Sequence, residues 1–216
     1  MKPQERLKSM NACSDAVAWA VAGGYKTFRD AWAGCSRGDW MLWYAGRLCK
    51  TTTARKRLVL AVCDCARPAL KFVKKGELRP LKLIETTEAW VCGKATIEQV
   101  RAAAAAVRYA TDDDAAAAAA NCATAAAIYA AAAVVYDPDA AYAASCAATY
   151  AAFAAAARIE TLAKCADIVR QHYPTPPANR GAHPGSRCGK ADVHVGAPAV
   201  PAGTAEKEEV AQWTAP

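Results

Sequence analysis

The sequence predicts an all-α protein: a compact multi-helix bundle of about seven or eight helices, with long Ala-rich C-terminal helices and a disordered tail. Three observations lead to this prediction. No stretch shows the alternating pattern and the Val, Ile or Thr enrichment of a β-strand. Capping residues, prolines and glycines divide the chain at intervals of helix length. Much of the 54% hydrophobic content is alanine, which has the highest intrinsic helix propensity.

Four helices are predicted before residue 77, over about 11–22, 28–33, 40–49 and 52–75. The residues expected to cap or end them are Gly23, Gly24, Thr27, Gly34, Asp39, Thr51 to Thr53 and Gly76. Pro68 is expected to kink or split the fourth helix, because proline lacks the backbone N–H and clashes with the preceding turn.

The third of these helices contains the most apolar stretch, GDWMLWYAGRL (38–48). One stripe at helical spacing consists of Trp40, Trp43, Tyr44, Arg47 and Leu48. Met41 and Leu42 widen this stripe until the helix is apolar almost all round. We therefore predict that this helix lies at the centre of the bundle, with Arg47 leading out of the core.

Two shorter helices follow, over about 80–92 and 97–109. Pro80 stands at the first position of one of them and Gly93 just past its end, which is the usual asymmetry of helix termini. Thr96 and Gln99 form a T-x-x-Q capping box for the other.

The C-terminal part contains two long Ala-rich helices and then changes character. Thr111 and three aspartates open the first of them, and Asp137–Pro138 separates it from the last, which is expected to reach His172. Residues 174–216 are rich in proline and glycine and show no periodicity. The predicted organisation is therefore a helical domain over 1–173 and a disordered tail over 174–216.

The composition indicates a cytoplasmic protein. The start of the chain, MKPQERLKSMNACSD, is charged and lacks an apolar segment, so we expect no signal peptide. The ten cysteines are scattered, mostly within predicted helices, and are expected to be reduced and buried. Residues 115–135 are long enough to span a bilayer, but Asn121 and Thr124 interrupt them and no basic residues flank them. We expect a packed helix there and no membrane partner.

The residues that carry metal or catalytic chemistry do not form a convincing site. Cys63 and Cys65 are two positions apart and point about 200° apart on a helix, so they cannot easily share an ion. His183, Cys188 and His194 lie in the tail, where nothing holds a ligand geometry. We expect neither a metal nor another cofactor.

Enzymatic motifs are missing as well. The chain has no G-x-S-x-G and no phosphate-binding glycine loop, and a Cys–His dyad would have to use His172. Glu85 and Glu88 share a helix face, and Asp112 to Asp114 open a helix, but a solvated or salt-bridged face is the commoner role of such pairs. We predict a protein that is not an enzyme.

Charge is distributed unevenly, and this keeps nucleic-acid binding open as an alternative. The net charge is +7 overall, whereas residues 1–80 carry 16 Lys and Arg against 6 Asp and Glu. Phosphate contacts require only a cluster of cations. The candidate cluster consists of Arg47, Lys50, Arg55, Lys56 and Arg57.

Two stretches carry a resemblance to a known family, FRDAWAGCSRGDWMLWYAGRL (28–48) and CDCARPALKFVKKGELRPLKLIETTEAWVCGKATIEQVRAAAAAV (63–107). With the Ala-rich helices they resemble the predicted all-α immunity proteins of bacterial polymorphic toxin systems, the family numbered five, over roughly residues 11–173. The positions that carry the resemblance are Asp39, Trp40, Leu42, Trp43, Arg79, Pro80, Ile84, Glu85, Ala89, Trp90 and Gly93.

The resemblance implies an all-helical, non-catalytic protein that neutralises a toxin by binding it. Relatives carried by phages leave a counter-defence role open. Inhibitors of basic nucleases are usually acidic, and because this chain is basic, we expect the bound surface of a partner to be acidic or apolar. A third hypothesis is a structural protein that forms homo-oligomers through its Ala-rich helices.

Six positions are the candidates for partner binding or for defining the family: Asp39, Trp40, Trp43, Arg79, Glu85 and Trp90. The alternative is that they hold the helices together. In that case Arg79 and Glu85 would form a buried ion pair, and loss of one partner would leave a charge stranded in the core.

Overall fold

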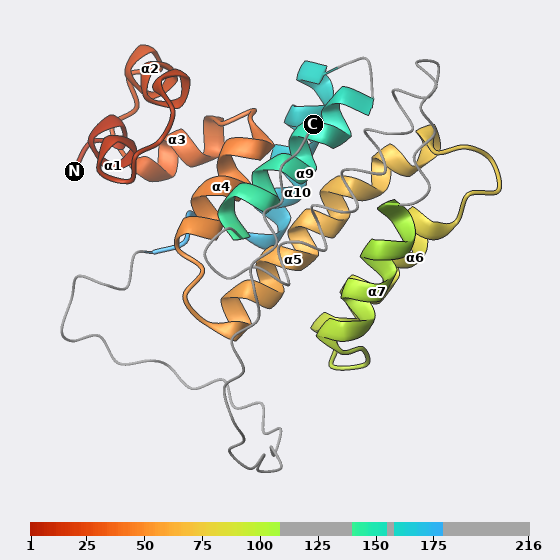
Figure 1. Ribbon diagram of the computed structural model, residues 1–216. Helices are drawn as coiled ribbons and strands as arrows, with labels where there is room; N and C mark the ends of the chain where they lie inside the picture. The colour runs from red at the N-terminus through yellow and green to blue at the C-terminus, as the bar shows by residue number, and fades with distance from the viewer. Residues whose placement is uncertain (109–139, 155–157, 179–216) are drawn as a thin grey trace, which may run out of the picture. The chain divides into compact units, whose positions relative to one another are not determined.

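The computed structural model describes residues 1–108, 140–154 and 158–178 of the chain (Figure 1). This part forms nine α-helices and one 3₁₀-helix and contains no strand, which confirms the predicted all-α class. The chain divides into two units, Met1–Asn179 and Arg180–Pro216, and only the first contains described residues. The predicted disordered tail over 174–216 therefore lies almost wholly outside the described residues and stays a prediction. So does the Ala-rich helix predicted after Thr111, together with Asp112 to Asp114.

The N-terminal helices are α1 (Pro3–Ser9), α2 (Ser14–Ala22) and α3 (Phe28–Gly34). The single helix expected over about 11–22 is wrong at its start, because a helix precedes it and a break at Asn11 separates the two. Asn11 has a φ of 58°, in the left-handed region that Asn tolerates better than most residues. Thr27 caps α3 as predicted, through a capping box with Asp30 whose two hydrogen bonds are both 3.1 Å long.

Helix α4 (Gly38–Arg47) begins two residues earlier than expected. Asp39 is not its cap, because the carboxylate of Asp39 pairs with the Arg37 guanidinium instead of accepting from the first turn. Helix α5 (Thr52–Ala66) is capped as predicted, with the Thr51 hydroxyl 3.1 Å from the backbone nitrogen of Ala54.

Pro68 divides the long predicted helix, as expected. Helix α5 ends at Ala66, and Pro68 stands in the first turn of the 3₁₀-helix η1 (Arg67–Phe72). Helix α6 (Arg79–Val91) has Pro80 in its first turn, and Gly93 follows it with a φ of 72°. Helix α7 (Ile97–Arg108) carries the predicted capping box between Thr96 and Gln99.

One long helix was expected to reach His172 from residue 138, and this prediction is wrong. Two helices occupy the region, α9 (Ala140–Ala154) and α10 (Arg158–His172), and they pack against each other. Residues 155–157, between the two helices, lie outside the described residues.

Helix α4 is the central helix of the described bundle, as predicted, and packs against α5, α9 and α10 (Figure 1). Its buried face differs from the predicted stripe: it contains Gly38, Met41, Leu42 and Ala45 together with Tyr44. Trp40, Trp43 and Leu48 are half-buried and Arg47 is exposed. Full burial of an aliphatic side chain contributes about 1.5–3 kcal/mol, so the Met41 and Leu42 face anchors the bundle.

Alanine allows α9 to lie close to α4 and α5. The alanines of one α9 face are almost inaccessible, and they are Ala143, Ala144, Ala147, Ala148 and Ala151. Because such side chains are short, helix axes approach more closely than leucine would permit. None of the described helices is long and apolar enough to cross a membrane, and residues 115–135 lie outside them.

Candidate functional site

An apolar pocket of about 30 Å³ lies among α1, α2, α3 and α4. Each of these helices contributes to its wall, which is mainly aromatic. The principal lining residues are Leu7 of α1, Trp19 of α2, Phe28 and Trp32 of α3, and Trp40 and Tyr44 of α4. Because four separate helices build it, the pocket exists only when the N-terminal part of the chain is folded.

Ring contacts hold these helices together around the pocket. Phe28 of α3 stacks on Tyr44 of α4 with ring centroids 4.6 Å apart, and Trp32 lies 5.8 Å from the same tyrosine. Trp19 of α2 contacts Trp40 of α4 edge-on at 6.0 Å. Aromatic pairs of this kind each contribute about 0.5–1.5 kcal/mol beyond their buried area.

The C-terminal end of α10 fixes the α3 wall of the pocket. The indole nitrogen of Trp32 donates a 2.9 Å hydrogen bond to the carbonyl of Tyr173. Nη1 of Arg170 donates to the carbonyl of Cys35 at 2.7 Å, just past the end of α3. Segments more than 130 residues apart in the sequence therefore position the same wall.

Two arginines lie against the aromatic rings at the edge of the pocket. The Arg37 guanidinium is 4.2 Å from the centroid of Trp40 and also pairs with Asp39 at 2.6 Å. The Arg6 guanidinium lies over the rings of Phe28 and Tyr44, at 4.9 and 5.4 Å from their centroids. Arg6 forms no ion pair with a carboxylate of the described part of the chain, whereas Arg37 does.

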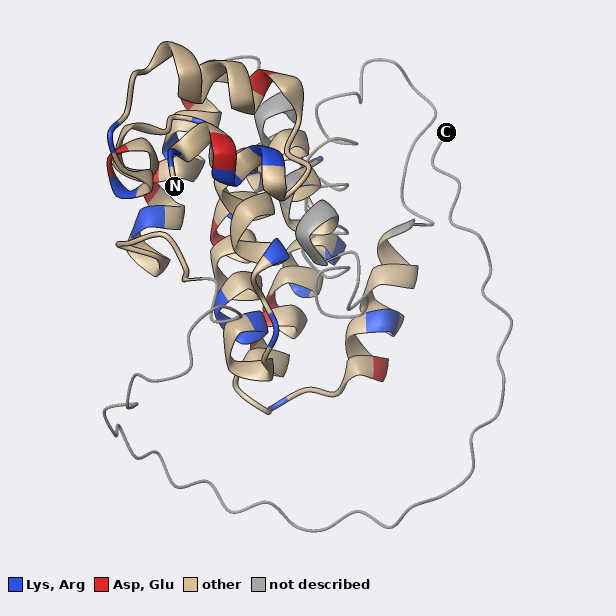
Figure 2. Ribbon diagram, turned by 90° about the vertical axis from the view of Figure 1, so that its left-hand side faces the viewer, with Lys and Arg blue, Asp and Glu red and all other residues tan. Residues whose placement is uncertain are grey.

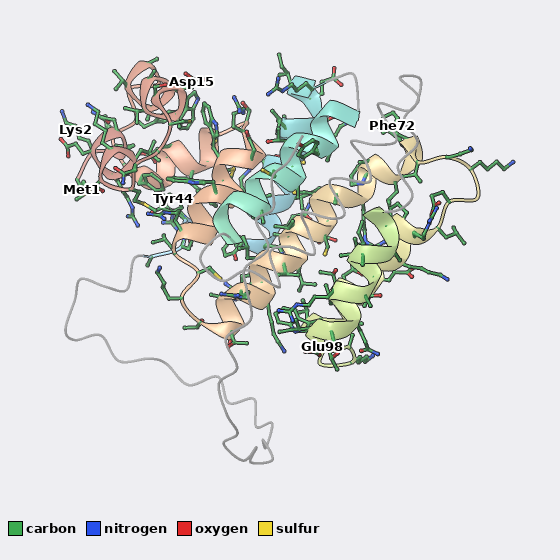
Figure 3. The ribbon with its side chains drawn as sticks, viewed as in Figure 1. Met1, Lys2, Asp15, Tyr44, Phe72 and Glu98 are labelled. Carbon is green, nitrogen blue, oxygen red and sulfur yellow. The ribbon has the colours of Figure 1, made fainter. Side chains whose placement is uncertain are left out.

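The hydroxyl group of Tyr44 is buried beside Arg6, and no described residue accepts its proton. Tyr44 projects from α4 toward α1 and α3 (Figure 3). Burial raises the pKa of Tyr44 to about 12, while the nearby Arg6 opposes this increase. Tyr44 is therefore a neutral phenol at physiological pH and has a proton to donate.

The buried cysteines are poorly suited to nucleophilic chemistry. Cys35 lines the pocket, and burial raises the pKa of its thiol to about 11. Burial also raises the pKa of Cys63, and Cys65 shifts in the same direction through its contact with Cys165 and through burial. Because the thiolate is the reactive form, these groups act as small apolar side chains at neutral pH.

Of the six positions singled out from the sequence, Asp39 and Trp40 lie at the pocket. Trp40 lines it, and Asp39 holds the arginine that stacks on Trp40. Trp43 is on α4 as well, but it is half-buried against the core and does not line the pocket.

The other three positions lie on α6 and do not join this site. The buried Arg79–Glu85 pair is wrong: both side chains are exposed, and Arg79 bonds to Glu77, with Nε 2.8 Å from Oε1. Glu77 is only two residues from Arg79 in the sequence, so the two side chains can form this ion pair at the surface. Trp90 is half-buried and has the Lys56 ammonium 5.9 Å from its ring centroid.

Within the predicted basic cluster, Lys50 and Arg55 lie near Cys49, and both Cys49 and Arg57 lie near Tyr173, whereas Lys56 is directed to α6. Arg47 and Lys50 are exposed near the end of α4, whereas Lys56 lies over Trp90 of α6. Arg57, the next residue, has its guanidinium 5.8 Å from the ring of Tyr173, beyond α10. Figure 2 shows Lys and Arg distributed over several helices. Arg55 is half-buried on the same turn of α5.

Two of the residues considered for acid/base chemistry, Glu88 and His172, have structural partners. Glu88 forms a two-pronged ion pair with Arg67, whose Nε lies 3.0 Å from Oε1. His172 contacts the Asp64 carboxylate at 2.7 Å, which joins the end of α10 to α5. No three potential metal ligands gather among the described residues, and His183, Cys188 and His194 lie outside them.

Most of the pocket was not predicted from the sequence: neither Trp19, Phe28, Trp32 and Tyr44 of its wall nor Arg6 at its edge was a candidate. A signal was present, since residues 19–43 contain four of the six tryptophans of the chain. Aromatic density alone, however, does not show which rings meet, because that depends on how four short helices pack.

No family model, no curated protein and no solved structure matches this chain. The resemblance to immunity proteins therefore stays a prediction.

Proposed function

We propose that the chain is a non-catalytic, cytoplasmic binding protein that neutralises a partner protein, such as a bacterial toxin, in a one-to-one complex. The observation that supports this proposal is the aromatic pocket with arginines at its edge. Binding energy at protein interfaces is concentrated in a few residues, and Trp, Tyr and Arg are the types most enriched among them. The pocket brings these three types together on one part of the N-terminal helices.

Electrostatics support the same proposal and describe the partner. The N-terminal 80 residues carry a net charge of +10, so they attract an acidic surface and accelerate its association. The buried thiols and the paired carboxylates serve the architecture of the bundle, which agrees with a protein that binds rather than catalyses.

A pocket-filling variant tests the proposal without removing any contact. Ala16 of α2 is buried and lines the pocket, whereas Ala18 of the same helix is exposed. Ala16→Leu places a larger side chain in the pocket, and Ala18→Leu makes the same chemical change on the outer face. Both variants should keep the helical circular dichroism spectrum of the wild type.

The experiment captures partners with the tagged full-length chain from its native host and measures the mass of the intact complex. We expect a one-to-one complex whose partner arrests bacterial growth when expressed alone. Coexpression of the wild type or of Ala18→Leu should relieve the arrest, and Ala16→Leu should fail to do so. A partner that arrests growth equally with and without the wild-type chain contradicts the proposed neutralisation.

A further inference from the structure

We infer that the pocket recognises an aliphatic side chain and a neighbouring carboxylate of the partner protein, with the aliphatic tip inside the pocket and the carboxylate bound by Arg6 and the Tyr44 hydroxyl. This inference rests on the proposed binding function and specifies the chemistry of the partner. Four features of the site support it: its size, its apolar wall, the unpaired arginine and the unpartnered hydroxyl.

The size of the pocket limits what enters it. A cavity of about 30 Å³ exceeds the roughly 10–15 Å³ that one water molecule requires, but it is far smaller than the roughly 150 Å³ cavity that accepts benzene. The tip of a leucine, isoleucine or valine fits these limits, whereas a tryptophan or phenylalanine ring does not. The wall of Leu7, Met41 and aromatic rings favours an uncharged, apolar group.

The charges at the edge exclude a cation. Aromatic pockets elsewhere bind quaternary ammonium groups through the faces of their rings. Here guanidinium groups already lie over Phe28, Tyr44 and Trp40, so a further cation would meet like charge. An anion at this position gains attraction instead.

Of the two arginines, Arg6 is the one whose charge is not paired with a carboxylate of the described residues. Asp39 already accepts two hydrogen bonds from Arg37, at 2.9 and 2.6 Å. Arg6 has no such partner among the described residues and lies over Phe28 and Tyr44, two rings that line the pocket. Leu7, the next residue of α1, lines the pocket as well.

Tyr44 supplies the second donor. Its ring lines the pocket, its hydroxyl is buried, and no described group accepts its proton. A buried hydroxyl without a partner costs about 1–3 kcal/mol, and a carboxylate would remove that cost. A guanidinium and a phenol next to an apolar pocket therefore complement an aliphatic group with an acid beside it.

Three small probes separate the two parts of this recognition in the full-length protein. N-acetylleucine carries both the aliphatic tip and the carboxylate, N-acetylleucinamide lacks the charge, and N-acetylalanine lacks the tip. Binding is measured by shifts of the indole N–H resonances in NMR spectra, because Trp19, Trp32 and Trp40 line the pocket. We expect N-acetylleucine to bind with a dissociation constant on the order of millimolar, as its size allows, and the other two at least tenfold more weakly.

Variants assign the effect to the named groups. Arg6→Gln should lower the affinity for N-acetylleucine at least tenfold and leave N-acetylleucinamide unchanged. Tyr44→Phe should lower it several-fold, and Ala16→Leu should abolish binding of both leucine probes. Arg29→Gln, an exposed arginine on α3, is the matched control and should have no effect.

Equal affinity for the acid and the amide would overturn the inference, and so would an Arg6→Gln variant that binds N-acetylleucine like the wild type. The growth assay with the captured partner distinguishes failure of this inference from failure of the proposed function. If Arg6→Gln and Ala16→Leu still neutralise the partner in the growth assay, the binding function stands and this site is not its recognition site.

Discussion

At the scale of single residues, Tyr44 combines a cost in stability with a capacity to bind. Its ring is among the most buried side chains of the core, yet its hydroxyl lacks a hydrogen-bond partner. Folding moves this hydroxyl from water into the core, where its proton has no acceptor, and this transfer costs free energy. Removal of such a group is therefore neutral or stabilising. We expect Tyr44→Phe to keep or raise the free energy of unfolding by about 1 kcal/mol. Urea denaturation measures this change, and a clear loss of stability would show that the hydroxyl has a partner.

The same residue makes stability sensitive to high pH. The folded state raises the pKa of Tyr44 from its ordinary value of 10 to about 12. The stability that comes from keeping the phenol neutral is therefore fully present below pH 10 and is lost as the pH rises toward 12. We expect the melting temperature of the wild type to fall more steeply than that of Tyr44→Phe between pH 10 and 12. Parallel slopes for the two proteins would contradict this assignment.

The ion pairs of Asp39 and Arg79 differ in how much they contribute to the stability of the fold. The Asp39 side chain is 7% exposed, whereas that of Arg79 is 44% exposed. Asp39→Ala leaves Arg37 without its carboxylate beside the core and should destabilise the protein by about 1–3 kcal/mol, since Arg37 is partly solvated. Arg79→Ala should leave the melting temperature unchanged, because water screens the exposed pair. Thermal unfolding of both variants checks this contrast, and equal losses would refute it.

At the scale of elements, the start of α4 meets α10 at a site where only glycine fits. A Cβ atom on Gly38 would lie 2.4 Å from Cβ of Cys165 and 2.7 Å from the backbone nitrogen of Ala166. Backbone atoms of α10 cannot move aside as a flexible side chain does, so Gly38→Ala should destabilise the fold by about 1–3 kcal/mol.

Gly34→Ala is the matched control for this prediction. A Cβ atom there meets the outer end of the Tyr25 side chain, with the hydroxyl oxygen 2.9 Å away, and that ring can turn aside. Chemical denaturation of the two variants should therefore show a large loss for Gly38→Ala and a small one for Gly34→Ala. Similar losses would indicate that α10 adjusts to the added methyl group.

Helix ends were predictable where local chemistry determines them. Thr27 and Thr51 each cap the helix that follows, and Thr96 with Gln99 forms the expected box, since these bonds connect residues three apart. The packing of α9 against α10 was not predictable from local patterns, because it depends on contacts with distant segments: both helices bury one face against α4 and α5.

At the scale of the whole described bundle, the class and the central position of α4 followed from composition and periodicity. The residues of the candidate site were predicted from the sequence only in part. Asp39 and Trp40 lie at the pocket, but Arg79, Glu85 and Trp90 are on α6. Pattern analysis finds unusual residues, whereas a pocket formed by four helices depends on contacts between distant segments. The hydrogen bond from Trp32 to Tyr173 is an example that no local pattern contains.

The arrangement of the basic side chains also bears on the nucleic-acid alternative. Successive residues of a helix point about 100° apart. Accordingly, Lys56 lies over Trp90 and Arg57 lies over Tyr173. Lys56 is therefore turned away from Arg57, and the five basic residues from Arg47 to Arg57 do not all face one phosphate backbone. Each phosphate contact contributes about −0.9 to the slope of log affinity against log salt concentration, so five would give a slope near −4.5. We expect no saturable binding of random-sequence DNA or RNA at 50 mM salt, measured by fluorescence anisotropy with Lys50→Glu as a charge control. Saturable binding with a slope near −4.5 would show that these cations do form one surface and would favour the nucleic-acid alternative.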